Sequence, residues 1–256
     1  MKITRQMERW SPLVVLVITL VIWQIGVTVL SVPEYIFPSP MEIANQFVEF
    51  RGPLMEAAWK TFWVTMIGFG ISVVVGVMLG FLVGSSRLAY AAFYPLMTAF
   101  NAVPKAAITP ILVVWFGIGV GPGILTAFLI SFFPITVNIA TGLATLEPEL
   151  EDVLRVLGAK RWDVLVKVGL PRSMPFFYGS LKIAITLAFV GTVLAEMTAG
   201  DSGIGYLMQS AGSQQRLPLA FAGLVTIGMM AMGMYELFSY IEKHTTAWAH
   251  RGSQNA

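Results

Sequence analysis

The chain has 256 residues, of which 56% are hydrophobic and 12% are charged, with a formal net charge of +2 at pH 7. Soluble domains usually carry about 25% charged residues, so this composition excludes an ordinary soluble domain and predicts a membrane protein. The small net charge gives no reason to expect a nucleic-acid partner, and the absence of cysteine excludes disulfides and thiolate chemistry. The two histidines, His244 and His250, lie in the C-terminal tail, so no metal site is expected in the apolar part of the chain.

Uncharged runs predict the membrane spans, because a spanning helix needs about 20 mostly apolar residues. Six spans are predicted, within the runs 10–33, 61–86, 88–104, 106–146, 183–195 and 217–235, with the fourth in the second part of its run. Lys105 interrupts the third span. The run 106–146 is too long for one helix, and its glycine-rich stretch Gly117–Gly123 predicts a tight hairpin. The first run lacks an Ala-x-Ala cleavage site, so a retained anchor helix is expected.

Six spans place both termini on the same side of the membrane. If that side is the cytoplasm, the inner segments hold 12 basic residues and the outer segments hold 3, with Lys105 unassigned. The positive-inside rule therefore predicts that the N- and C-termini are cytoplasmic. The outer segment 31–60 begins extended and then predicts a short amphipathic helix over 41–50. The whole chain, 1–256, is expected to form one all-α transmembrane domain.

The inner loop at about 145–175 is the longest segment on that side and holds ten of the 30 acidic and basic residues. Pro148 and the acids around it predict the start of a helix. Gly158 predicts its end. A second short helix is predicted from Arg161 to Val168, ended by Gly169-Leu170-Pro171. The apolar residues of the first helix share one face and are Leu150, Val153, Leu154 and Leu157.

These residues carry a resemblance to a known family. The segment Asp152–Trp162, followed by Leu170-Pro171, resembles the EAA loop of permease subunits of binding-protein-dependent ABC importers. The acid, the glycine and the Leu-Pro pair have that motif's spacing, whereas Val153 and Leu154 stand in place of its two alanines. Other segments are similar to the nitrate, sulfonate and taurine branch of the family: Ile36–Pro40, Ile108–Gly119, Phe132–Asn138 and Ala195–Leu207.

The resemblance implies a type I ABC importer permease fold in a bacterial inner membrane. It also implies a homodimer, two copies of a separate ATPase subunit that push on the loop, and a periplasmic or lipoprotein substrate-binding protein. The solute would be small, organic and anionic. The residues that the resemblance assigns to ATPase coupling are Asp152, Leu154, Gly158, Ala159, Lys160, Arg161, Trp162, Leu170 and Pro171. The alternative is that the amphipathic loop helix simply lies on the membrane surface.

The chain contains no phosphate-binding loop, and the dipeptide Gly-Lys never occurs in it. We therefore expect no cofactor and no catalytic residue in this chain, which is not predicted to be an enzyme. ATP and Mg²⁺ are expected on the partner ATPase.

Polar residues inside predicted spans are candidates for the translocation path or its gate. The candidates are Asn101, Lys105, Asn138 and Glu196. At ~1.5 Å per residue, Lys105 lies roughly 20 Å into a ~30 Å hydrocarbon core, where it meets an anionic substrate or lines the gate. The alternative is a helix break at Pro104, with Lys105 reaching the interface or pairing with a carboxylate. Solvation at a helix end is the alternative for Glu196, and helix packing is the alternative for Asn138.

A ladder of glycines, Gly76, Gly80 and Gly84, predicts close helix packing in the second span.

Two other classes of protein are weighed against the importer subunit. An ion-coupled secondary transporter of a small solute normally carries internal repeats and buried acids. Here only Glu196 and Glu236 border the inner spans. An intramembrane enzyme has less support, because the spans hold no Ser-His-Asp set, no His-Glu-x-x-His motif and no paired aspartates. The substrate stays open among sulfonates, nitrate, taurine, aromatic acids and vitamin precursors.

Overall fold

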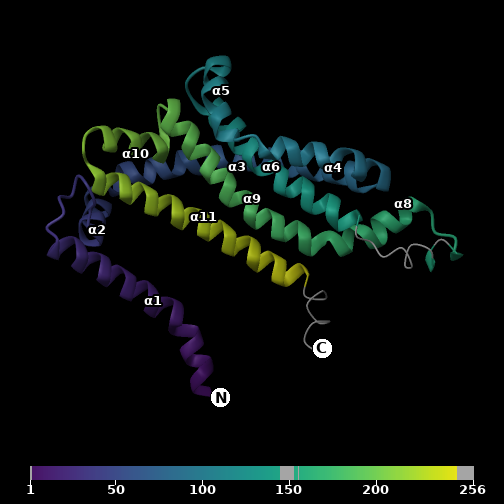
Figure 1. Ribbon diagram of the computed structural model, residues 1–256, viewed down its shortest axis with the longest axis horizontal. Helices are drawn as coiled ribbons and strands as arrows, with labels where there is room; N and C mark the ends of the chain where they lie inside the picture. The colour runs from purple at the N-terminus through teal and green to yellow at the C-terminus, as the bar shows by residue number, and fades with distance from the viewer. Residues whose placement is uncertain (1, 145–152, 155, 247–256) are drawn as a thin grey trace.

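The computed structural model describes residues 2–144, 153–154 and 156–246, and all regular secondary structure in those ranges is helical (Figure 1). This confirms the all-α class. The helices are α1 (Lys2–Val29), α2 (Pro40–Glu49), α3 (Arg51–Gly84), α4 (Arg87–Ala102), the 3₁₀ helix η1 (Lys105–Ile108), α5 (Thr109–Phe116), α6 (Val120–Ala144), α8 (Arg161–Val164), the π-helix η2 (Leu165–Gly169), α9 (Leu170–Ala199), α10 (Gly203–Ser213) and α11 (Leu217–Thr245).

Five of the described helices are long and apolar enough to cross a membrane, and α4 with η1–α5 makes a sixth when this pair, bent by 69°, counts as one span. The six predicted spans are thereby confirmed in number and order. The hairpin predicted by the glycines is also confirmed, since Gly117 ends α5 and α6 begins at Val120. The predicted outer helix is α2, which begins with a capping box between Ser39 and Glu42.

Three spans are longer than predicted. α3 begins at Arg51 instead of residue 61, α9 covers Leu170–Ala199 where the uncharged run covered only 183–195, and α11 continues to Thr245 instead of ending at residue 235. The prediction was wrong because it ended each span at a charged residue. Lys60 pairs with Glu56 at 3.0 Å and Lys182 pairs with Glu242 at 2.6 Å, so both lysines are accommodated inside their helices.

The predicted end of the second loop helix is also wrong. Leu170 and Pro171 do not end a helix; α8, η2 and α9 follow one another from Arg161 to Ala199 without an intervening loop. Proline lacks an N–H, and its ring clashes with the carbonyl four residues earlier in a regular α-helix. The wider π turn directly before Pro171 relieves this conflict, because π-bulges commonly absorb such interruptions. The result is one helical rod that connects the loop to the body.

The core of the fold is α6, which packs between α3 and α9. A Cβ on Gly80 of α3 would lie 2.8 Å from the carbonyl oxygen of Thr136, and one on Gly191 of α9 would lie 2.9 Å from the Cα of Ala127. Only glycine lets these backbones approach so closely, which confirms that the glycine ladder serves packing. Hydroxyl groups join the same helices, with Ser72 and Ser131 2.7 Å apart.

The helices have two distinct ends (Figure 1). One end carries α2 and α10, and the opposite end carries α8 and the end of α11. We call these the α10 end and the α8 end. α1 runs apart from the body and meets it near α2 (Figure 1). Only 6% of the residues in the most apolar stretch of α1 are buried.

Candidate functional site

The third span breaks at Pro104. α4 ends at Ala102, and Val103 has the extended conformation (φ −68°, ψ 126°) that a following proline favours. The chain then turns by 69° into η1 and α5. The break that was one of the two alternatives is therefore present, and it positions Lys105 at the corner.

Lys105 and Asn101 come together at this corner. The Lys105 ammonium donates to Asn101 Oδ1 at 2.7 Å and to the Asn101 carbonyl oxygen at 3.2 Å, and it lies 5.7 Å from the ring centroid of Phe133. The lysine is only 9% exposed. Within the described ranges no carboxylate pairs with it. Because an ammonium has three donors, this arrangement leaves capacity for one further acceptor.

Glu196 lies at the α10 end and is buried, with 8% of its surface exposed, so the interpretation as a solvated helix end is wrong. Both of its carboxylate oxygens lie 2.9 Å from the hydroxyl of Thr61, and one accepts the backbone N–H of Gly205 at 2.9 Å. The Thr61 hydroxyl in turn accepts the N–H of Ile204 at 2.8 Å. A carboxylate from α9 and a hydroxyl from α3 thus satisfy the first turn of α10, where the helix dipole favours negative charge.

The contact between Glu196 and the first turn of α10 requires glycine at position 203. Its φ is +91°, and a Cβ at this position would collide with the Glu196 carboxylate. Sequence reasoning found Glu196 but missed Thr61, which lies 135 residues away and has no local signal. Glu196 therefore fixes the position of α10 against α3.

Asn138 lies in α6 and is half-buried. Its side-chain amide donates to the Pro134 carbonyl oxygen of the same helix at 2.8 Å. In the part of the chain that the structure describes, no hydrogen bond joins this amide to a second helix or to Lys105. The packing interpretation fits this geometry better than a ligand contact.

The loop at the α8 end keeps the predicted glycine stop. Gly158 has φ +85°, and the N–H of Ala159 donates to the Leu154 carbonyl oxygen at 3.0 Å, which is the 6→1 hydrogen bond of a Schellman motif. The carbonyl of Lys160 then accepts the N–H of Val164 in α8. Asp152 lies outside the described residues. Arg161 and Trp162 form the first turn of α8, and Leu170 and Pro171 form the first turn of α9.

This loop presents apolar side chains outward. Val156 is 88% exposed and Leu157 is 77% exposed, beside a pocket of about 320 Å³ that Leu154, Ala159 and Val164 help to line. Nearby, the hydrogen bond and charge of Lys167 lower the pKa of Asp163, which keeps that carboxylate ionised at neutral pH. An exposed apolar tip with charged flanks is typical of a surface that another protein covers.

The fold and these two ends define a multi-pass membrane transport subunit. The chain belongs to the family of binding-protein-dependent transport system inner membrane components, whose model matches residues 72–244. It is therefore the membrane-spanning subunit of an ABC importer in a bacterial inner membrane. This membership confirms the resemblance and replaces the secondary-transporter and enzyme alternatives.

Individual relatives agree with this assignment. The chain is 31% identical over 237 residues to the riboflavin transport system permease protein RibX of Chloroflexus aurantiacus, covering 92% of this chain and 88% of that protein. It is 26% identical over 240 residues to the taurine transport system permease protein TauC of Escherichia coli, covering 91% and 87%. Its fold matches the inward-facing MetNI methionine ABC transporter with a TM-score of 0.67 at 19% identity, over 77% of this chain and 98% of that chain.

Proposed function

We propose that this chain, as a single permease domain, forms a solute path that is driven from the α8 end by a separate ATPase. The observation that carries the proposal is the glycine stop at Gly158 and the exposed apolar tip directly before it, Val156 and Leu157. Its connection to α8, η2 and α9 supports a lever that transmits a push into the body. The coupling residues are those that the resemblance assigns, namely Asp152, Leu154, Gly158, Ala159, Lys160, Arg161, Trp162, Leu170 and Pro171.

The proposed partners follow from the family and from the size of the chain. Six spans alone do not readily enclose a path with alternating access, so we propose a second copy of this chain. Two ATPase subunits bind ATP and Mg²⁺, and a binding protein delivers the solute. The distribution of lysine and arginine supports a cytoplasmic α8 end, with both termini on that side.

We propose a small anionic organic solute, such as a sulfonate. The buried ammonium of Lys105, with one donor to spare, supports an anion at the corner of the broken span. TauC is named for taurine, which is a sulfonate, whereas RibX is named for riboflavin. Asn101 orients Lys105, Asn138 lies in the neighbouring α6, and Glu196 holds the outer gate through α10.

The coupling proposal is tested by cross-linking from an introduced cysteine. Because the sequence contains no cysteine, the introduced residue is the only reactive thiol in this chain. Cysteine in place of Val156 is expected to give an adduct with the ATPase subunit in native membranes. Cysteine in place of Ser213, which is exposed at the α10 end, is the matched control and is expected to give none. The proposal fails if Val156→Cys captures no nucleotide-hydrolysing partner, or if Ser213→Cys captures the same one.

The substrate proposal is tested at Lys105. Lys105→Met is expected to abolish uptake of the transported anion while the amount of chain in the membrane stays unchanged, and Lys105→Arg is expected to retain part of it. The measurement is uptake of a panel of labelled sulfonates, taurine among them, by the complete transporter. Unchanged uptake by Lys105→Met would remove this lysine from the path.

A further inference from the structure

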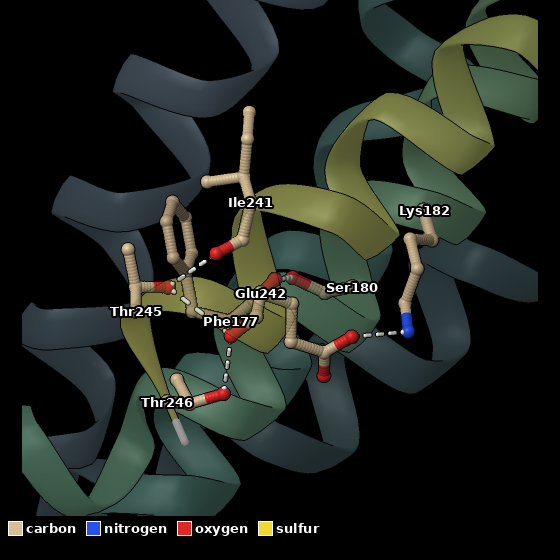
Figure 2. A network of polar contacts seen from close by, with 7 residues as sticks. All are labelled: Phe177, Ser180, Lys182, Ile241, Glu242, Thr245 and Thr246. Carbon is tan, nitrogen blue, oxygen red and sulfur yellow. Dashed lines mark hydrogen bonds and ion pairs between the residues drawn. The ribbon is translucent and has the colours of Figure 1, made fainter.

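An ion pair joins α9 to α11 at the α8 end (Figure 2). The Lys182 ammonium lies 2.6 Å from Glu242 Oε2. Only 18% of the lysine side chain and 13% of the glutamate side chain are exposed. A charge pair this well shielded is held strongly in place, because separating it leaves an uncompensated charge in a medium of low dielectric.

α11 contacts Lys182 at two points on one face. The ammonium lies over the ring of Tyr235, 5.7 Å from its centroid, and Tyr235 is two helical turns before Glu242. Glu242 itself is in the last turn of α11. Its carbonyl oxygen accepts both the hydroxyl of Thr246 at 2.7 Å and the Thr246 N–H at 2.8 Å, and Thr246 is buried (Figure 2). The end of α11 is therefore fixed where it holds the lysine.

The position of the pair along the helices relates it to the loop. At ~1.5 Å per residue, Glu242 lies about 37 Å from Leu217, beyond a ~30 Å hydrocarbon core measured from that end of α11. Lys182 lies on the helical rod that begins at Arg161 beside the loop. The pair thus lies at the α8 end of α11 and in the half of α9 that follows α8 and η2.

We propose that Lys182 and Glu242 are positioning residues that make the inner halves of α9 and α11 move as one body when the ATPase displaces the loop. This inference rests on the proposed function of the loop. Apolar contacts between two helices allow one helix to slide along the other. The Lys182 ammonium, in contrast, has one carboxylate partner, Glu242, and one aromatic ring, Tyr235, so it fixes a single register between α9 and α11. Through this pair, a push on α8 reaches α11 as well as α9.

The test measures the α9–α11 distance in different nucleotide states. Thr186 on α9 and Leu237 on α11 are exposed, and cysteine at both positions allows spin labelling of the otherwise cysteine-free chain. In the assembled transporter, diluted with unlabelled chain, the wild-type pair is expected to give one distance without nucleotide and the same distance with ATP and vanadate. Lys182→Met and Glu242→Gln are expected to broaden the distribution and to make it shift with ATP and vanadate.

Matched variants separate this role from general stability. Lys243→Met and Glu236→Gln remove the same charges from exposed positions of α11 and are expected to keep the single distance. The exchanged pair Lys182→Glu with Glu242→Lys is expected to restore it, which a loss of folding would not permit. The inference is overturned if the wild-type distance shifts with nucleotide, if both charge-loss variants keep one distance, or if the exchange does not restore it.

The Val156→Cys cross-link distinguishes the two proposals. If that cross-link to the ATPase forms while the distance test fails, only the role of the ion pair is wrong. If the cross-link itself is absent, the proposed function of the loop is wrong.

Discussion

α1 and α6 are both apolar helices that span a membrane, but they relate to the rest of the protein in opposite ways. α1 has the higher mean hydropathy of the two. Only 6% of the residues in its most apolar stretch are buried, however, against 44% of those in the corresponding stretch of α6. Hydropathy measures how favourably a helix enters lipid, and it does not measure how closely another helix can approach. The comparison teaches that apolar residues predict which helices span the membrane, whereas small residues predict which of these helices are buried among the others.

The small residues of the core lie where helix backbones meet. α6 contributes Ala127 and Ala140, which have no exposed surface, and α3 and α9 present glycines to them. Lipid tails are as apolar as leucine, so helix association in membranes depends on such close packing and on hydrogen bonds between helices. Glycine substitutions therefore test the comparison directly, and their effects are graded by what each new side chain meets.

The largest effect is expected at the α3–α6 contact. Gly80→Leu inserts a side chain whose Cβ would lie 2.8 Å from both Ile139 Cβ and the Thr136 carbonyl oxygen. Overpacking against a backbone that cannot move costs about 3 kcal/mol or more. Gly70→Leu is the control on the same helix, because a Cβ there meets nothing within 4 Å. Thermal unfolding in detergent checks this prediction, and equal unfolding temperatures for the two variants would contradict it.

The next effect is expected at the α10 end. Gly203→Ala forces an alanine into φ +91° and into the Glu196 carboxylate, at a cost of about 2 to 3 kcal/mol. Because Glu196 and Thr61 anchor the first turn of α10, the loss is expected to loosen this helix before the core. Hydrogen exchange of the backbone amides over 203–213 measures it. Protection that stays at the wild-type level would show that the hydrogen bonds of Glu196 and Thr61 to α10 do not depend on glycine at position 203.

Gly212→Ala is the control at the other end of α10, where a Cβ has open space. It is expected to leave the exchange of the first turn unchanged. Loss of protection in the first turn to the same extent in both variants would indicate a general effect of alanine and not the contact with Glu196.

The sequence was sufficient to predict the number and order of spans, the hairpin and the glycine stop, and it gave the break at Pro104 as one of two alternatives. These features depend on local composition and on proline and glycine, whose conformational preferences act within a few residues. It did not predict that α3 and α9 continue through Lys60 and Lys182, because the partners that accommodate these lysines lie outside the uncharged runs. In the case of Lys182 the partner is 60 residues away.

The candidate site shows the same division. Asn101 and Lys105 are four residues apart and were found together, since their contact lies within one corner of the chain. The hydrogen bonds of Glu196 were not foreseen, because they need Thr61 from α3 and Gly205 from the first turn of α10. Whether a carboxylate is buried depends on its tertiary neighbours. From the sequence alone, a glutamate at the end of an apolar run is therefore predicted to be exposed to solvent.

A smaller effect is expected at the loop. Gly158→Ala meets no steric obstacle, so its cost is only that of φ +85°, about 1 kcal/mol. The loss is local, and we expect the unfolding temperature to stay unchanged while the yield of the Val156→Cys cross-link to the ATPase falls. Gly158→Asn, which tolerates this conformation better, is expected to retain more of the yield. Equal yields for alanine and asparagine would show that the turn does not set the position of the loop tip.

The smallest effect is expected in α1. Gly26→Leu places a side chain where a Cβ meets nothing within 4 Å, so the unfolding temperature of the isolated chain is expected to stay at the wild-type value, within about 0.5 kcal/mol of stability. A loss as large as that of Gly80→Leu would contradict the separation between α1 and the core. Comparing the same substitution in the isolated chain and in the assembled transporter sharpens the result. A loss of stability that occurs only in the assembled transporter would mean that another subunit packs against α1. In that case α1 is exposed in the single chain and covered in the assembly.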